Sequence, residues 1–441
     1  FPFKELFQRL KPTFVVIILA LVLFHQPIFA RIVSLLDASP SSSQAIRTLE
    51  IEDSLRLISA KSFPLGVGPA HIPLYYPAYR SVLHNNTPEW TQYPEQIRNN
   101  YLNILAGLGP LALLAFLGFL GATIYSARRE LRNTSFLLLF AGWLAFAFHG
   151  LFYFYTATAW IYFLTFSAAL LALAKPNTIF TLNVKKIVII PALVVCVIAL
   201  LIGGNTIVQV LRAEIIFAQG LKDYNELSYI QLFPEGQANI LFTDHQFTQE
   251  DQGILTQALE KFLVTSSVTP IPIPVYERQY IHSLALLGSL QEEKEKREQA
   301  LLQAINIATN NVEKRPQNRL DIGLQASIAF RAVLSDVERE QHLEIAIEDD
   351  KQLTKLDPTN PTNFDNLGLV LREKGDLQEA RKAFEKSIEL KPDRVPPYLH
   401  LGETMVLTGE KQAARKIYEG ALEVSGDPQN PFVLEKIHKL E

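Results

Sequence analysis

Long apolar runs in the first half of the chain constrain its fold more than any other feature. A helix needs about 20 mostly apolar residues to cross a hydrocarbon core about 30 Å thick. Runs of this kind lie at 13–30, 103–125, 135–154, 157–174 and 187–203. Because most of them follow one another with only short gaps, the sequence predicts a polytopic transmembrane helix bundle in residues 1–203.

Basic residues predict how this bundle is oriented. Lys and Arg cluster before the first run, between the second and third, and between the fourth and fifth. The clusters are Lys4, Arg9 and Lys11; Arg128, Arg129 and Arg132; and Lys175, Lys185 and Lys186. Positively charged loops tend to stay in the cytoplasm. We therefore expect the loop 31–102 and the tail 204–441 to lie outside the cytoplasm.

Composition bears on the completeness of the chain and excludes several kinds of site and partner. The chain begins at Phe1 and its single Met is Met405, so we expect an amino-terminally truncated chain with further spans upstream. One cysteine, Cys196, excludes a disulfide framework and a cysteine-ligated zinc site. The formal charge of −4 averages a membrane part of +7 and a tail of −11. The acidic tail has no basic stripe, which argues against a nucleic-acid partner.

The loop 31–102 contains the residues best suited to bind a ligand. The run 64–69 (PLGVGP) predicts a turn in which Gly66 and Gly68 adopt positive φ and let another backbone or a ligand approach closely. Aromatic and basic residues surround this turn: Tyr75, Tyr76, Tyr79, Trp90, Tyr93 and Tyr101, with Arg56, Arg80, Arg98, His71 and His84. Two interpretations stay open, namely an interfacial aromatic belt and a site for an anionic lipid-linked substrate, in which arginines would bind a diphosphate and aromatic faces would stack on sugar rings.

Acidic residues open the same loop. We expect Asp53 or Ser54 to cap a short helix that runs through Ala60. Glu50, Glu52 and Asp53 are interpreted as a solvated entrance to this helix rather than as a metal site.

Residues 53–112 resemble the carboxyl-terminal region shared by O-antigen ligases and O-antigen polymerases, a family that includes protein O-oligosaccharyltransferases. The family pattern is an arginine on a short outer helix, a P-L-x-G-x-G turn, an aromatic stretch, and H-N-x-x-L-x-x-L-x-E-x-G-x-x-G leading into a membrane helix. The matching residues are Arg56, Pro64, Leu65, Gly66, Gly68, Asn99, Leu102, Leu105 and Gly109. Three positions depart from the pattern: Arg98 replaces the histidine, Gly107 the glutamate and Ala112 the last glycine.

The resemblance implies a metal-independent glycan transferase without a cofactor, in the bacterial inner (cytoplasmic) membrane. It would move a polyprenyl-diphosphate-linked glycan to an acceptor hydroxyl on a glycan, lipid or protein outside the cytoplasm. Arg56 and Arg98, with Arg80, would hold the diphosphate. The other expected substrate-binding residues are Gly66, Gly68, Trp90 and Asn99.

The base that activates the acceptor hydroxyl is a separate question. Arginine cannot accept a proton at neutral pH, so we expect the base at His84 or His71, with Glu89 and Glu95 as further candidates.

The alternative function is a non-catalytic, membrane-anchored scaffold for envelope assembly.

A 34-residue repeat marks the tail. Nine positions within 364–387 have an identical or similar residue 34 positions later, within 398–421; Gly368 and Gly402 are one such pair. The pattern strongly resembles the tetratricopeptide repeat (TPR), a pair of antiparallel helices whose small residues allow close packing. The clearest units are 361–394 and 395–428, and 327–360 is a candidate degenerate unit.

The expected fold class is therefore all-α: a transmembrane helix bundle followed by a TPR-like α-solenoid over 326–441. Residues 204–325 are expected to form a helical connecting region with degenerate repeats, and 225–275 to be its irregular part. A TPR groove would take a protein or peptide partner. The residues expected to face it are Asp365, Leu369, Arg372, Leu399, Glu403 and Val406.

Overall fold

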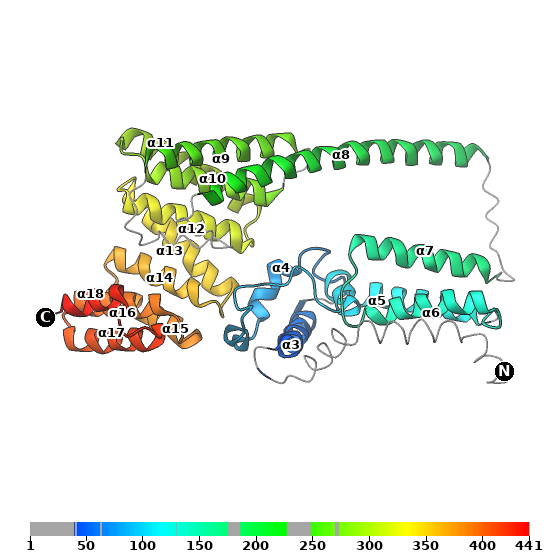
Figure 1. The fold of residues 1–441 in the computed structure, drawn as a ribbon, viewed down its shortest axis with the longest axis horizontal. Coiled ribbons are helices and arrows are strands. Elements are labelled where there is room, and N and C mark those ends of the chain that lie inside the picture. Colours follow the sequence, from blue (N-terminus) through cyan, green and yellow to red (C-terminus); the bar gives the residue numbers. More distant parts are fainter. Residues whose placement is uncertain are drawn as a thin grey trace. The chain divides into compact units, whose positions relative to one another are not determined.

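The chain divides into two compact units, Phe1–Thr181 and Leu182–Glu441. The computed structural model describes residues 39, 42–61, 64–128, 130–174, 186–226, 248–269 and 273–440, with backbone alone for 186–203. Every regular element in these ranges is a helix (Figure 1), which confirms the all-α prediction for the part that is described. The apolar run 13–30 lies outside the described residues.

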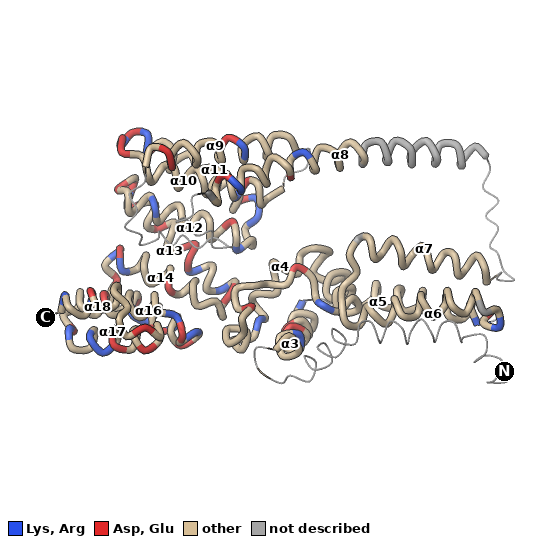
Figure 2. The backbone as a smooth tube through the Cα atoms, viewed as in Figure 1, with Lys and Arg blue, Asp and Glu red and all other residues tan. Residues whose placement is uncertain are grey.

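The first unit contains the 19-residue helix α3 and three short helices, followed by three apolar helices. In chain order these are α3 (Ser43–Lys61), α4 (Ile72–Tyr75), η1 (Tyr76–Tyr79), η2 (Val82–Asn86), α5 (Asn100–Ala127), α6 (Thr134–His149) and α7 (Ala157–Leu173). Along α5, α6 and α7 no residue is charged, and Figure 2 shows these helices uniformly tan.

Among the helices whose side chains are described throughout, only α5 is long and apolar enough to cross a membrane, judged by length and composition. The apolar run 187–203 of α8 lies outside the residues with described side chains. The third and fourth predicted spans correspond to α6 and α7, which have 16 and 17 residues and are therefore shorter than a usual span. The polytopic bundle accordingly stays a prediction.

Aromatic packing joins the three apolar helices. Trp143 of α6 and Phe163 of α7 are fully buried and stack with ring centroids 5.7 Å apart. The Trp143 indole donates its N–H to Ser167 Oγ at 2.7 Å, so its polar edge has a partner in an apolar setting. Phe116 of α5 packs against Phe163 at 6.0 Å.

The second unit is built of consecutive antiparallel helices. They are α8 (Lys186–Glu226), α9 (Gln249–Val268), α10 (Pro274–Ser289), α11 (Lys294–Lys314), α12 (Arg319–Leu334), α13 (Arg339–Leu356), α14 (Pro361–Lys374), α15 (Leu377–Leu390), α16 (Val395–Leu407), α17 (Lys411–Ser425) and α18 (Pro431–His438). Each helix packs on its neighbour in the chain, which is the arrangement of an α-solenoid.

Two expectations for this unit differ from the structure. The stretch 225–275 was expected to be irregular, but α9 lies within it. This prediction is wrong for 249–268 because Thr248 and Asp251 form a capping box and Phe262 is fully buried among Phe217 and Tyr224. In addition, α8 continues through residue 203, where the sequence placed a domain boundary, and the two units divide at Thr181–Leu182.

Helix pairs occur where the repeats were predicted. The pairs α14–α15 and α16–α17 occupy the units 361–394 and 395–428. A third pair, α12–α13, covers the candidate degenerate unit, although α12 begins at Arg319 rather than at 327. Close packing depends on glycine here: a Cβ at Gly368 would lie 2.5 Å from a ring carbon of the fully buried Phe384. Gly402 meets Tyr418 in the same way.

Gly368→Ala is expected to destabilise the α14–α15 pair by about 1–3 kcal/mol, because the Phe384 ring must shift to admit the methyl group. Hydrogen exchange of residues 361–390 in the full chain measures this as faster opening. Gly420→Ala is the matched control, since its Cβ would meet Tyr398 at an ordinary 3.7 Å and alanine favours the helix. Equal exchange in both variants would contradict the packing argument.

The stability of α13 is expected to fall as pH rises, because two of its aspartates are buried. Burial raises the pKa of Asp349 to about 7, and it raises the pKa of Asp350 well above the ordinary value. A carboxyl with a raised pKa in the folded state stabilises fully below its unfolded pKa, near 4, and this contribution is lost as pH rises through the folded pKa.

Asp349→Asn should therefore slow hydrogen exchange in 339–356 relative to the unmodified chain at pH 8 and change it little at pH 5. The exposed Glu340, in the first turn of the same helix, provides the control Glu340→Gln. The same ratio of exchange rates at both pH values would rule out this account.

Candidate functional site

A buried carboxylate on α3 organises the loop between α3 and α5. Asp53 is fully buried, and its oxygens contact four groups from two segments. Arg56 Nη1 lies 2.9 Å from Oδ1, while Oδ2 accepts bonds from the Tyr76 hydroxyl at 3.2 Å and the Ser81 backbone N–H at 3.0 Å. His84 Nε2 lies 2.9 Å from the same oxygen. Asp53 thus joins α3 to η1 and η2.

The prediction that Asp53 or Ser54 caps a short helix is wrong. The helix begins ten residues earlier, at Ser43, so both side chains lie within it and both are fully buried. The interpretation of this acidic cluster as a solvated entrance is also wrong for two of its three members. Asp53 is 0% and Glu50 5% exposed, whereas the Glu52 side chain is 53% exposed.

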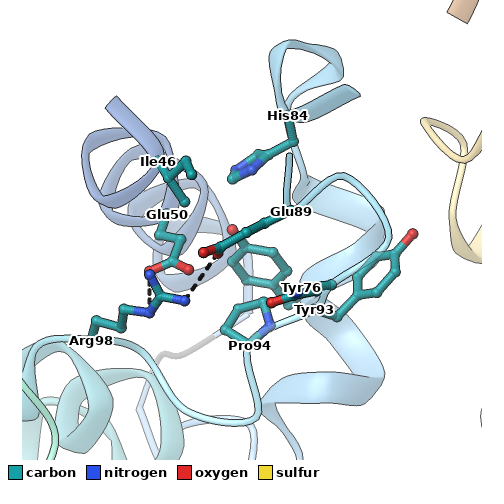
Figure 3. Close-up of a pocket in the computed structure, with 9 residues that line it drawn as sticks. Ile46, Glu50, Tyr76, His84, Glu89, Tyr93, Pro94 and Arg98 are labelled. Atoms are coloured by element: carbon teal, nitrogen blue, oxygen red, sulfur yellow. Dashed lines mark hydrogen bonds and ion pairs between the residues drawn. The ribbon is translucent and has the colours of Figure 1, made fainter. Parts of the chain in front are cut away.

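Glu50 lines a small pocket beside Asp53 (Figure 3). The pocket has a volume of about 50 Å³. Its lining residues are Ile46, Glu50, Tyr76, His84, Glu89, Gln92, Tyr93, Pro94 and Arg98. Arg98 lies between two carboxylates, with Nε 3.4 Å from Glu50 Oε2 and Nη2 3.1 Å from Glu89 Oε2. Burial raises the pKa of Glu50, and the positive charge of Arg98 opposes that rise.

The glycine turn fits against a break in α5. Gly109 has φ 85° and ψ 175°, and Pro110 follows it. Proline has no N–H, so it cannot donate to the carbonyl of Ala106 four residues earlier. The backbone N–H of Val67 donates to that carbonyl at 2.8 Å, and the N–H of Gly68 donates to the Gly107 carbonyl at 2.9 Å. The turn and the broken helix complete each other's hydrogen bonds.

Both glycines of the turn have positive φ, as predicted, at 75° for Gly66 and 104° for Gly68. A Cβ at Gly66 would lie 2.5 Å from the Gly107 carbonyl and 2.6 Å from the Gly109 nitrogen. The close approach at Gly66 is therefore to another backbone. A substrate-binding role for these glycines stays a prediction.

Asn99 and its neighbour hold the start of α5. The Asn99 side chain accepts the Leu102 N–H as an N-cap at 3.0 Å and donates to the Leu151 carbonyl at 2.8 Å. The buried Asn100 accepts the Tyr155 N–H at 3.3 Å, and its own N–H donates to the Gly150 carbonyl at 2.7 Å. Asn99 was expected to bind substrate, and in this structure its side chain forms helix-end contacts.

The remaining predicted residues fall into two groups: those at the buried carboxylates and the pocket, and those with contacts elsewhere in the loop. Arg56, with half of its side chain exposed, lies beside Asp53, and His84 and Arg98 line the pocket. Arg80 is buried and donates to the Trp90 carbonyl at 2.6 Å and to Asn85 Oδ1 at 3.2 Å, so its guanidinium supports the loop. His71 is exposed and lies against the glycine turn, with Nδ1 3.0 Å from the Pro69 carbonyl.

Glu50 and Asp53 are the functional candidates that the sequence interpretation missed. The spacing of these residues along the sequence could have indicated that both are buried on one face of a helix. Ile46, Glu50, Asp53 and Leu57 recur at intervals of four, three and four residues and are all buried, so they share one face of α3. Among the residues with described side chains, no cluster of His, Cys, Asp and Glu is suited to hold a metal ion.

The repeat region contains ion pairs at three of the predicted groove positions. Arg372 of α14 contacts Glu403 of α16 at 2.6 Å, and Lys436 of α18 contacts the other Glu403 oxygen at 2.5 Å. Asp365 is buried, and His400 Nδ1 lies 2.9 Å from its Oδ1. These charges are paired between successive helices.

Comparison with known proteins identifies the repeat. The tetratricopeptide repeat family matches residues 361–394, so this segment is a TPR. No curated protein matches the chain.

Solved structures are similar to about two fifths of the chain. MamA (41-end) from Desulfovibrio magneticus RS-1 is 16% identical, with a TM-score of 0.33, over 41% of this chain and 89% of that one. The thermophilic TPR protein TTC0263 of Thermus thermophilus is 17% identical, with a TM-score of 0.35, over 43% and 91%.

Gly66→Ala is expected to detach the turn from α5, since the new methyl group would meet backbone atoms that cannot move aside. A loss of about 1.4 kcal/mol would make opening of this contact about tenfold more frequent. Limited proteolysis of the full chain in nanodiscs, read as cleavage within 64–100, measures the change. Gly118→Ala in α5 has free space for its Cβ and should cleave like the unmodified chain.

Proposed function

We propose that this chain is a membrane glycan transferase of the O-antigen ligase and polymerase type. It would transfer a polyprenyl-diphosphate-linked glycan to an acceptor hydroxyl outside the cytoplasm, without a metal ion. The observation that carries the proposal is that Arg56, His84 and Arg98 lie around two buried carboxylates, beside a pocket. This cluster is next to α5, which has the length and composition of a membrane span.

The cationic residues of this site suit a diphosphate. The Arg56 guanidinium is held by Asp53 at 2.9 Å and lies 3.9 Å from the exposed Glu52, while half of its side chain remains exposed to receive an anion. Arg98 is 30% exposed and is oriented by Glu50 and Glu89. Guanidinium groups bind phosphate oxygens in pairs and stabilise the negative charge that develops on the leaving diphosphate.

The reaction itself needs little beyond positioning and one proton acceptor. The acceptor oxygen forms a bond to the anomeric carbon as the bond from that carbon to the diphosphate oxygen breaks, and the diphosphate leaves with the electron pair. The hydroxyl proton passes to a base of the protein. Holding donor and acceptor in line supplies much of the acceleration.

A second candidate function comes from the repeats. TPR units expose a groove that binds protein or peptide partners, and residues 361–394 are such a unit. In this alternative the chain is a membrane-anchored scaffold for envelope assembly, and the apolar helices only anchor it. The two functions are compatible if the repeats bring the acceptor or a partner enzyme to the membrane.

Arg56→Ala and Arg98→Ala distinguish the two functions. In a strain that lacks the gene, the unmodified chain should restore the surface glycans, and each variant should lower them at least tenfold because the diphosphate loses a charged contact. Electrophoresis and mass spectrometry of surface glycans provide the measurement. Lys61→Ala, an exposed basic residue at the end of α3, is the control and should restore them fully.

Full restoration by both arginine variants would rule out the transferase mechanism and favour the scaffold.

A further inference from the structure

The pocket beside α3 holds more negative than positive charge at close range. Glu50 and Glu89 share the single guanidinium of Arg98, at 3.4 and 3.1 Å. The Oε2 atom of Glu50 is buried and lies 3.4 Å from Arg98 Nε, but no described residue donates a hydrogen bond to it. A buried carboxylate oxygen without a donor is costly, so this atom favours a proton or a hydroxyl group as its partner.

The shape of the pocket suits such a partner. Its volume of about 50 Å³ exceeds what a water or hydroxyl-sized group requires. Figure 3 shows the Glu50 carboxylate directed toward Arg98 and Glu89, with the His84 ring on another side of the same space. An acceptor hydroxyl that enters here would meet Glu50 close to Arg98.

The other candidate bases are less well placed. His84 has its Nε2 atom 2.9 Å from Asp53, whose carboxylate also binds Tyr76 and Ser81. Glu89 is one-third exposed and hydrogen-bonds Arg98 directly. His71 lies at the glycine turn and does not line the pocket.

We infer that Glu50 is the base that removes the proton from the acceptor hydroxyl, and that Arg98 is its positioning residue; the inference rests on the proposed transferase function. The proton moves to the Glu50 carboxylate as the acceptor oxygen bonds to the anomeric carbon and the diphosphate departs with the electron pair. Glu50 afterwards releases the proton to water.

The electrostatic setting of Glu50 is consistent with this role. Burial raises its pKa, which makes the carboxylate a stronger proton acceptor than an exposed one. The charged and titratable groups that influence it are Arg98, Glu89, His84 and Arg47. The positive charge of Arg98 opposes this rise in pKa and favours the ionised carboxylate.

Two measurements on the full chain test the inference: restoration of surface glycans in the deletion strain, and binding of undecaprenyl diphosphate to the purified chain in nanodiscs by native mass spectrometry. Glu50→Gln keeps the shape of the side chain and leaves Arg98 paired with Glu89. We expect it to lower glycan transfer about 100-fold or more and to bind the probe like the unmodified chain. Glu50→Asp should retain part of the activity, because it keeps a carboxylate.

Lys61→Ala, exposed at the end of the same helix, is again the control and should restore glycans fully. Full restoration by Glu50→Gln, together with loss of transfer in His84→Asn, would overturn the inference and assign the base to His84. Loss of transfer together with loss of probe binding in Glu50→Gln would show a structural role and would also overturn it. If the unmodified chain neither binds the probe nor restores glycans, the proposed function itself fails.

Discussion

The break in α5 at Gly109 and Pro110 is the constraint on which the arrangement of the first unit depends. A proline inside an apolar helix leaves the carbonyl of Ala106 without its helical partner, and a buried carbonyl without a donor is costly. The Val67 N–H donates to this carbonyl at 2.8 Å, and the Gly68 N–H donates to the neighbouring Gly107 carbonyl at 2.9 Å. Glycine at 66 and 109 is required because any Cβ there would collide with the opposite backbone. The loop is thereby fixed to a helix that has the composition of a membrane span.

The buried carboxylates of α3 depend on this attachment. Asp53 contacts residues 76, 81 and 84, and Glu50 contacts Arg98, so the carboxylates become buried only when the loop folds back over α3. Their burial has an electrostatic cost that neighbouring cations and N–H donors offset. The result is a pocket in which two carboxylates, one guanidinium and one imidazole lie close together (Figure 3). A buried cluster of titratable groups of this kind is a candidate functional site.

Much of the architecture was predictable because it is local or periodic. The 34-residue spacing of Gly368 and Gly402 predicts helix pairs, and the structure places α14–α15 and α16–α17 there. The positive φ of Gly66 and Gly68 follows from a turn that only glycine accommodates easily. The helix α9 was missed because composition suggested a loop, while the capping box of Thr248 and Asp251 fixes a helix start. The role of Asp53 was missed because an aspartate early in a presumed helix was interpreted as a cap.

The sequence by itself determined where apolar helices and repeats occur, because side-chain period and hydrophobicity act over a few neighbouring residues. It also determined which residue types are available for chemistry in the loop between α3 and α5. Only the tertiary structure decided that Glu50 and Asp53 are buried, that Asn99 caps α5, and that Arg98 lies between two carboxylates. Burial and charge pairing depend on residues that are up to about fifty positions apart, and their proximity exists only after the chain has folded.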